Sequence, residues 1–228
     1  KIDIKDFSLF LETQRPIIKY NEIFIPIKNI KAYVDFLSLL KSETKIKKTS
    51  IALEELDISQ LKKLSVFIKP SNFKNFFEKI KNGKLISEID IFSNDQGTLD
   101  NFIAKGSIED LNVELYDNII FSNSNLNFFA DKNDILIKNI FGNLSGINIS
   151  DGDIKLSLDN GLKIKSNFKS FIDLSDKQFK KYSQILDKFN LKDNLKSLKA
   201  NTNNTFIIDL DNTYKVKNYN YDISGNIK

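Results

Sequence analysis

The chain has 228 residues, and its 41% hydrophobic content with 19 phenylalanines excludes an intrinsically disordered protein. Its net charge of +4 comes almost entirely from lysine, since Arg15 is the sole arginine among 34 basic residues. Nucleic-acid sites use clustered positive charge and bidentate arginine contacts, so the composition argues against nucleic-acid binding. Cysteine and histidine are both absent from the sequence, which excludes disulfides, thiolate nucleophiles, zinc chemistry and triad hydrolysis. We therefore expect no cofactor and no metal.

The sequence contains no run approaching the roughly 18 apolar residues of a membrane span, and no signal peptide. It starts at Lys1 without methionine and stops in Ser224-Gly225-Asn226-Ile227-Lys228, which is typical of a strand that is beginning. We therefore expect the chain to be an excerpt of a longer polypeptide.

Residues 1–83 are predicted to form an N-terminal α+β segment. Short strands are expected at residues 1–11, 22–27, 45–58 and 64–68. Apolar residues recur at helical spacing over residues 29–41, which predicts an amphipathic helix there. A second helix is predicted from Ser71 as its N-cap to a stop just before Gly83.

Residues 84–228 are predicted to form a repetitive antiparallel β segment, because many short strands follow one another with short Gly, Asn and Asp loops. The expected strands are 84–92, 101–105, 111–115, 119–122, 125–130, 134–140, 147–150, 154–158, 162–168, 205–210 and 214–223.

The clearest predicted hairpin spans residues 153–165, where apolar residues hold every second position on both sides of an Asn160-Gly161 turn. Successive side chains of a strand point to opposite faces, so the apolar residues form one strip while the lysines face water. What covers that strip decides the function.

A helical insert is expected at residues 175–199. Ser175-Asp176-Lys177-Gln178 resembles a capping box, and Phe179, Tyr182, Ile185, Leu186 and Phe189 follow on one helix side. We expect this insert to cap or plug one end of the sheet. A membrane-surface role is disfavoured because its polar side mixes lysine with aspartate.

A loose repeat places glycine two residues before an aliphatic residue. It recurs at Gly106-Ser107-Ile108, Gly142-Asn143-Leu144, Gly152-Asp153-Ile154 and Gly225-Asn226-Ile227. Such repeats at strand starts indicate a repetitive architecture. The predicted fold class is mainly β: an elongated, curled antiparallel sheet, shaped like a groove, with two to four short amphipathic helices.

The succession of Ile89-Asp90-Ile91, residues 102–113 and residues 135–146 follows a pattern of strand, Gly-x-aliphatic, strand. It resembles the AsmA-like superfamily of bridge-like lipid transfer proteins with a β-groove. The resemblance covers most of the chain and implies an inner-membrane anchor upstream of Lys1 and a periplasmic body in a Gram-negative bacterium. It also implies phospholipid transport between the inner and outer membrane and a role in envelope assembly. The implied partners are phospholipid acyl chains and other envelope proteins, and no catalytic motif carries over.

A lipid groove needs a continuous apolar lining, because each acyl methylene removed from water gains about 0.8 kcal/mol. Strand parity predicts that this lining comprises Leu111, Val113, Leu115, Leu126, Phe128, Ile135, Ile137, Ile154, Leu156, Leu158, Leu162 and Ile164. An alternative is that these residues pack on a second sheet or on the helices as an ordinary core. The chain would then be a structural or adhesin-like β-rich interaction domain.

A third hypothesis is that the chain is an enzyme. Its best candidates are the carboxylate pairs Glu109 with Asp110 and Asp151 with Asp153, in the manner of glycoside hydrolases. Solvated turn acids explain both pairs better, given the preference of aspartate for turns. Calcium at residues 151–153 or 131–134 is disfavoured because the six or more oxygen ligands are not visible in the spacing.

Overall fold

The computed structural model describes residues 2–3, 8–20, 23–41, 44–61, 78–116, 119–158, 161–182, 197–213 and 215–227. The strands are β1 (Ile2–Asp3), β2 (Ser8–Gln14), β3 (Ile17–Tyr20), β4 (Ile23–Val34), β5 (Ile46–Leu53), β6 (Leu56–Asp57), β7 (Ile80–Ser93), β8 (Leu99–Tyr116), β9 (Ile119–Asp131), β10 (Asp134–Leu144), β11 (Ile147–Ser157), β12 (Leu162–Ser175), β13 (Ser197–Leu210) and β14 (Val216–Ile227). The helices are α1 (Phe36–Leu40), α2 (Ile58–Leu61), α4 (Asp176–Phe179) and the 3-10 helix η2 (Lys180–Tyr182).

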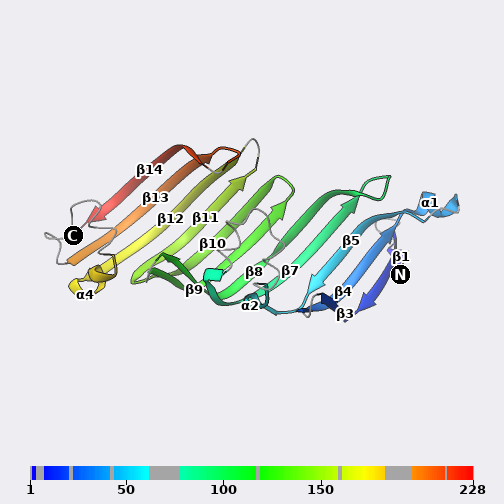
Figure 1. The fold of residues 1–228 in the computed structure, drawn as a ribbon, viewed down its shortest axis with the longest axis horizontal. Coiled ribbons are helices and arrows are strands. Elements are labelled where there is room, and N and C mark those ends of the chain that lie inside the picture. The colour runs from blue at the N-terminus through cyan, green and yellow to red at the C-terminus, as the bar shows by residue number, and fades with distance from the viewer. Residues whose placement is uncertain are drawn as a thin grey trace. The chain divides into compact units, whose positions relative to one another are not determined.

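The strands form one open antiparallel sheet in the order β1-β2-β4-β5-β7-β8-β9-β10-β11-β12-β13-β14 (Figure 1). β3 pairs with β4, and β6 pairs with β7. The prediction of a mainly β chain with an open antiparallel sheet and short helices is confirmed. From β7 onwards each strand neighbours the next one in sequence, as short connections favour.

The chain divides into two compact units. Unit 1 comprises Lys1–Leu56, Leu85–Ser107 and Phe128–Lys132, and unit 2 comprises Asp57–Lys84, Ile108–Asn127 and Asn133–Lys228. The boundary predicted after residue 83 falls inside β7.

In unit 1, the buried apolar residues of the described part are Phe10, Ile27, Val34 and Leu56. Asp90 of β7 is bound by two side chains of the neighbouring strand β5. It accepts a hydrogen bond from Ser50 Oγ at 2.6 Å, and Lys48 Nζ lies 2.9 Å from its other oxygen. Partial burial acts to raise the pKa of Asp90, but the hydrogen bonds from Ser50 and Lys48 and the lysine charge outweigh it, so the pKa is lowered.

The prediction of a helix over residues 29–41 is wrong for most of that range. β4 continues to Val34, and only α1 is helical. Ile30 pairs with Thr13 of β2 on one side and with Ile51 of β5 on the other. Two flanking ladders of hydrogen bonds therefore override the local helical spacing. The predicted strand at 64–68 and most of the helix from Ser71 lie outside the described residues, while Ile80 and Gly83 belong to β7.

Unit 2 contains β-bulges, and those at Asp110, Asn123 and Asp151 lie where the sequence predicted breaks between strands, whereas Asn139 lies inside the predicted strand 134–140. Asp110, Asn123, Asn139 and Asp151 lie inside β8, β9, β10 and β11, and each has a φ between 50° and 54°. Asparagine and aspartate tolerate this left-handed conformation better than other residues with a side chain. The predicted segments 101–105 and 111–115 thus join into one strand of 18 residues, β8.

Each bulge inserts one residue and so switches the parity of the strand. In β10 the register shifts between Ile137, which pairs with Ile154, and Ile140, which pairs with Gly152. The backbone N–H of Asn139, freed by the shift, donates to Asp153 Oδ1 at 3.3 Å. In the same way Asp110 N–H donates to Asn125 Oδ1 at 3.0 Å. Polar side chains of the next strand thus bind the bulged backbone.

The repeated glycines lie inside strands, so the prediction that they mark strand starts is wrong. Gly106, Gly142, Gly152 and Gly225 belong to β8, β10, β11 and β14. At Gly142 an added Cβ would come within 2.6 Å of the Phe121 ring. Glycine therefore serves close packing on the sheet there, rather than a turn.

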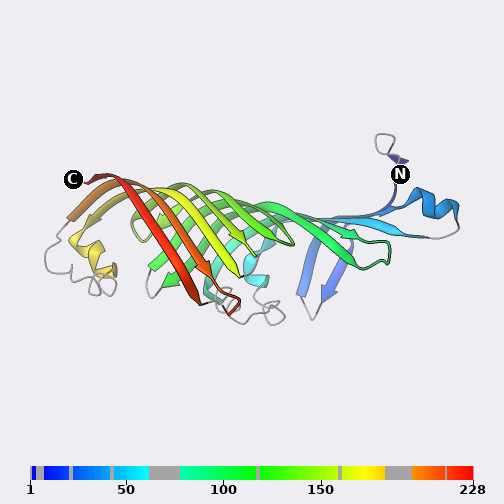
Figure 2. The same ribbon diagram turned by 90° about the horizontal axis from the view of Figure 1, so that it is seen from above.

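The helical segment α4–η2 lies at the end of β12 (Figure 2). Gln178 Oε1 accepts a hydrogen bond from Ser175 N–H at 2.8 Å, which is half of the predicted capping box. The Tyr182 hydroxyl donates to the backbone oxygen of Leu144, and burial raises the pKa of Tyr182 to about 12. The segment thus covers one end of the unit 2 sheet, and residues 183–196 of the predicted insert lie outside the described residues.

We expect Asn139→Val to lower the free energy of unfolding by about 1–2 kcal/mol relative to Asn139→Gly. Glycine adopts a φ of 54° without strain, whereas a β-branched residue does not. Urea titration of the two variants measures the difference, and equal stability would contradict the bulge.

We expect Tyr182→Phe to lower the stability of unit 2 by about 1 kcal/mol, because the Leu144 carbonyl loses its donor. Tyr219→Phe, which removes the hydroxyl of an exposed tyrosine, is the matched control. Denaturant unfolding compares the two, and a loss no larger than that of the control would argue against the docking contact.

We expect Asp90→Asn to destabilise unit 1 by about 1 kcal/mol near pH 7, and the difference from wild type to vanish in acid. The folded pKa of Asp90 is lowered, so its contribution is present above the unfolded value near 3.8 and is lost as pH falls through the folded value. Unfolding curves at pH 7, 5 and 3 test this, and a difference that does not shrink between pH 7 and pH 3 would contradict the carboxylate's role.

Candidate functional site: the apolar face of strands β10–β14

The register of unit 2 places alternate residues of five strands on one face. Ile137 lies opposite Ile154, Leu156 opposite Ile164, and Ile164 opposite Ile208. Directly opposed residues of an antiparallel pair share a face, so these side chains are neighbours. We call this the apolar face, and its aliphatic and aromatic members are Ile135, Ile137, Ile140, Leu144, Ile147, Ile149, Ile154, Leu156, Leu162, Ile164, Phe168, Ile172, Leu174, Leu198, Ala200, Phe206, Ile208, Leu210, Tyr219, Tyr221, Ile223 and Ile227.

The opposite face is polar, and its charges pair across strands. The ion pairs are Lys155–Asp134 at 3.0 Å, Lys163–Asp209 at 3.6 Å, Lys169–Asp151 at 2.9 Å and Lys199–Asp173 at 3.0 Å. Exposed pairs of this kind add little stability, at most about 1 kcal/mol each. They do neutralise the lysines locally, so this face presents no concentrated basic surface.

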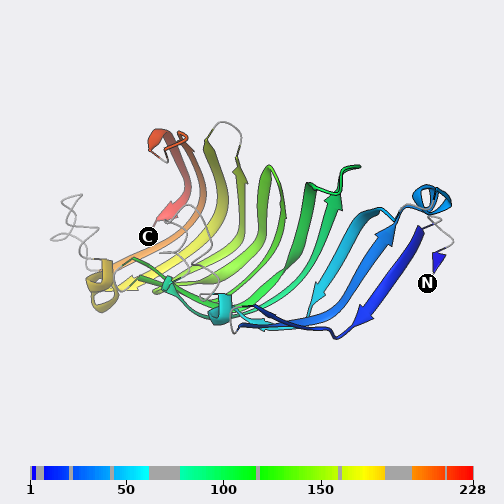
Figure 3. The same ribbon diagram turned by 45° about the vertical axis from the view of Figure 1, so that its right-hand side comes forward.

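One half of the apolar face is only partly covered. Ile135, Ile137, Ile154, Leu156, Ile164, Phe206 and Ile208 are half-buried, and Tyr219 and Tyr221 are exposed. We call these nine residues the apolar band. They lie toward the hairpins that join β9 to β10 and β13 to β14, and β10–β14 bend along their lengths in Figure 3. In a sandwich a second sheet would cover such residues, but the described strands of unit 2 belong to a single sheet.

The rest of the face is covered unevenly. Ile140, Leu174 and Ala200 are buried, toward the end where α4 contacts β12. Leu144 and Ile172 are half-buried, and Ile227 is 74% exposed, so only a few positions of this half are packed as in a core.

A hydrogen-bonded polar cluster lies between the two halves on β12, β13 and β14. Ser170 and Thr202 share a hydrogen bond of 2.6 Å between their hydroxyl oxygens, and Asn204 Nδ2 donates to Thr202 Oγ1 at 3.0 Å. Tyr221 Oη donates to Asn204 Oδ1 at 3.1 Å, and burial raises the pKa of Tyr221. No buried side-chain polar atom in the described part of the chain lacks a partner. The cluster therefore fixes the register of the three strands and is not an unsatisfied binding site.

Only some of the predicted lining residues belong to the apolar band. Ile135, Ile137, Ile154, Leu156 and Ile164 belong to the apolar band, and Leu162 lies on the same face but is buried.

Leu111 and Val113 are 7% and 3% exposed, so they belong to the packed core and offer almost no surface to a ligand. The alternation of side chains along the strand assigned Leu111 and Val113 to a face, but it could not show that other residues cover this part of the face. Leu115 and Leu158 are exposed, and Leu158 lies just beyond the end of β11. Leu126 and Phe128 are half-buried on β9, where Phe128 belongs to unit 1 and lies close to Gly106.

Four members of the band, Phe206, Ile208, Tyr219 and Tyr221, were not among the predicted lining residues. The signal was present, because both pairs keep the every-second-residue spacing of the hairpin at 153–165.

The candidate acids have structural roles. Asp151 is a bulge residue paired with Lys169, and Asp153 accepts the N–H of Asn139. Asp110 is itself a bulge residue, and Glu109 precedes it on the exposed surface. Within the described ranges no cluster of three or more acidic residues could hold a metal ion.

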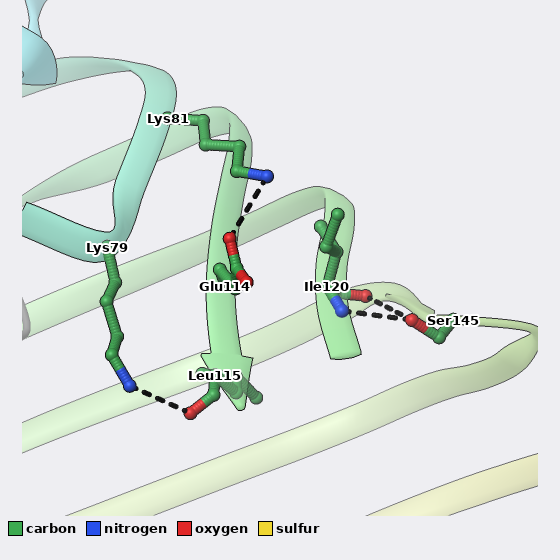
Figure 4. Close-up of polar contacts among 6 residues, drawn as sticks. All are labelled: Lys79, Lys81, Glu114, Leu115, Ile120 and Ser145. Carbon is green, nitrogen blue, oxygen red and sulfur yellow. Dashed lines mark hydrogen bonds and ion pairs between the residues drawn. The ribbon is translucent and has the colours of Figure 1, made fainter. Parts of the chain in front are cut away.

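A polar depression of about 490 Å³ lies at the opposite end of unit 2 from the apolar band. Its lining includes Lys81, Asn143, Ser145 and Lys181. Figure 4 shows the ion pair of Lys81 with Glu114 and the hydrogen bond that Ser145 Oγ accepts from the N–H of Ile120; the distances are 3.2 Å and 2.9 Å. The first contact joins β7 to β8 and the second joins β9 to the turn after β10, and the polar lining does not suit an acyl chain.

No helix in the described part of the chain is long and apolar enough to span a membrane. Comparison of the chain with protein-family models, with curated proteins and with solved structures finds no match in any of the three.

Proposed function

We propose that the chain is a non-enzymatic lipid-binding segment whose apolar band takes up phospholipid acyl chains. The observation that carries this proposal is the band itself: nine apolar residues from five adjacent strands share one face, and none of them is fully buried. The opposite face carries paired charges and stays in water.

The dimensions of the band fit an acyl chain lying across the strands. Adjacent strands are spaced by about 4.8 Å, so five strands span about 19 Å. One leaflet of a bilayer has a hydrocarbon layer of about 15 Å, which is half of the usual core. An acyl chain on the band would gain about 0.8 kcal/mol for each methylene removed from water.

The same proposal assigns the chain to an AsmA-like protein of the Gram-negative periplasm. Phospholipid would then travel between the inner and outer membrane along the band, in support of envelope assembly, with an anchor outside these residues. Its support is the open antiparallel sheet of neighbouring strands, together with the recurring Gly-x-aliphatic triplets, which lie inside those strands.

A second candidate is a structural or adhesin-like interaction domain. The buried residues of unit 2 favour it, because Leu111, Val113 and Leu174 are as inaccessible as the residues of an ordinary core. The two candidates differ in what the apolar band contacts, since only the first predicts bound lipid.

Ile207 and Ile208 provide a matched test. They are adjacent residues of β13, both half-buried, and the register directs them to opposite faces. We expect Ile208→Asp to reduce phospholipid uptake about tenfold, because a carboxylate enters the band, while Ile207→Asp leaves it near the wild-type level.

The measurement is phospholipid retained by delipidated protein after incubation with labelled phosphatidylethanolamine and phosphatidylglycerol vesicles. Circular dichroism establishes that both variants are folded. Absence of uptake by the wild-type chain, or equal loss in the two variants, would contradict the lipid-binding proposal and leave the interaction domain.

A further inference from the structure

The connection between β4 and β5 exposes apolar side chains beside lysines. It contains α1, which lies beyond the ends of these two strands (Figure 1). Phe36 and Leu40 are 54% and 69% exposed, and Ile46 at the start of β5 is 44% exposed. Lys41 and Lys45, between Leu40 and Ile46 in the sequence, are exposed as well. We call these five residues the α1 tip.

The tip lies inside the sheet order and not at an edge of the sheet. β4 has β2 on its other side, and β5 has β7 on its other side. Phe36 and Leu40 are four residues apart, which places them on the same side of α1. Ser38 lies between them and is buried, and its Oγ donates to Asp35 Oδ2 at 2.6 Å. α1 is therefore held through Ser38, while the described residues leave the side with Phe36 and Leu40 uncovered.

The charge around the tip is positive. Residues 35–48 contain four lysines and two acids, Asp35 and Glu43. Asp35 is bound at both carboxylate oxygens, because Ser38 donates to one and Lys47 Nζ lies 2.9 Å from the other. This acid is thus already neutralised within the connection.

Another turn of unit 1 shows that exposed apolar side chains do not always come with positive charge. Leu99 is 64% exposed, which is close to Leu40. Residues 94–100 around it contain two aspartates and no lysine. The combination of exposed apolar side chains with lysine therefore distinguishes the α1 tip from this turn.

We propose that the α1 tip docks on an anionic lipid bilayer. Phe36 and Leu40 enter the headgroup region and the upper part of the acyl chains, and Lys41 and Lys45 contact lipid phosphates. Insertion of apolar side chains and attraction of lysines to anionic lipids add together in such interfacial segments. A protein partner fits less well, because three exposed apolar side chains fall short of the roughly 800 Å² per partner that a standard protein interface buries. The proposal is independent of lipid uptake by the apolar band, since the tip belongs to unit 1 and the band to unit 2.

Co-sedimentation of the full chain with phosphatidylcholine vesicles that contain phosphatidylglycerol tests the docking. We expect Leu40→Ser and Lys41→Glu each to lower the vesicle partition coefficient about tenfold, since one loses an inserting side chain and the other reverses a charge. Leu99→Ser is the matched control and should bind as the wild type does, with thermal unfolding to compare the stability of the variants. Binding of the wild type should weaken when salt is raised or phosphatidylglycerol is omitted. Absence of binding by the wild type, wild-type binding by both tip variants, or an equal loss in Leu99→Ser would each overturn the proposal.

The absence of tryptophan from the chain allows a second test. We expect the fluorescence of Phe36→Trp to shift to shorter wavelength on the same vesicles and to be quenched by brominated acyl chains, because the indole enters the interface. Phe171→Trp is the control, since Phe171 is 48% exposed on the polar face of β12 in unit 2. Its emission should stay unchanged. An unshifted tryptophan at position 36, or an equal shift at both positions, would contradict docking through α1.

Discussion

The register of the antiparallel ladder is the constraint on which unit 2 depends. Because side chains alternate between the two faces, a shift of one residue in any of β10–β14 would move its isoleucines and leucines to the charged side. The bulges obey the same constraint. In β11 the apolar face is occupied by Ile147 and Ile149 before Asp151 and by Ile154 and Leu156 after it, so the inserted residue changes the parity while the face keeps its chemistry.

Much of this fold could be predicted from sequence because alternation and turn chemistry are local signals. The hairpin formed by β11 and β12 is the best case, since Leu156 pairs with Ile164 as the spacing requires. The bulges at Asp110, Asn123 and Asp151 could not be distinguished from turns, because asparagine and aspartate supply positive φ equally to both. The helix expected over residues 29–41 failed for a different reason: the ladders on both sides of β4 are long-range, and no local window contains them.

The candidate site was predictable in part for the same reason. Parity correctly grouped Ile137, Ile154 and Ile164, because a face follows from counting residues along a strand. Whether other residues cover that face does not follow from counting residues along a strand. Leu111 is buried and Ile154 half-buried, although both alternate in the same way, because packing from residues distant in sequence closes one part of the sheet and leaves the other open.

The order of the strands from β7 to β14 follows the order of the chain, so each strand is held mainly by its two sequence neighbours. Stability in such an arrangement is close to a sum of nearest-neighbour terms, as in repeat proteins. Such a sheet opens one strand at a time, because removal of a strand breaks only the ladders that it shares with its neighbours. Amide hydrogen exchange in unit 2 should accordingly differ from strand to strand, a graded profile in place of a single cooperative transition.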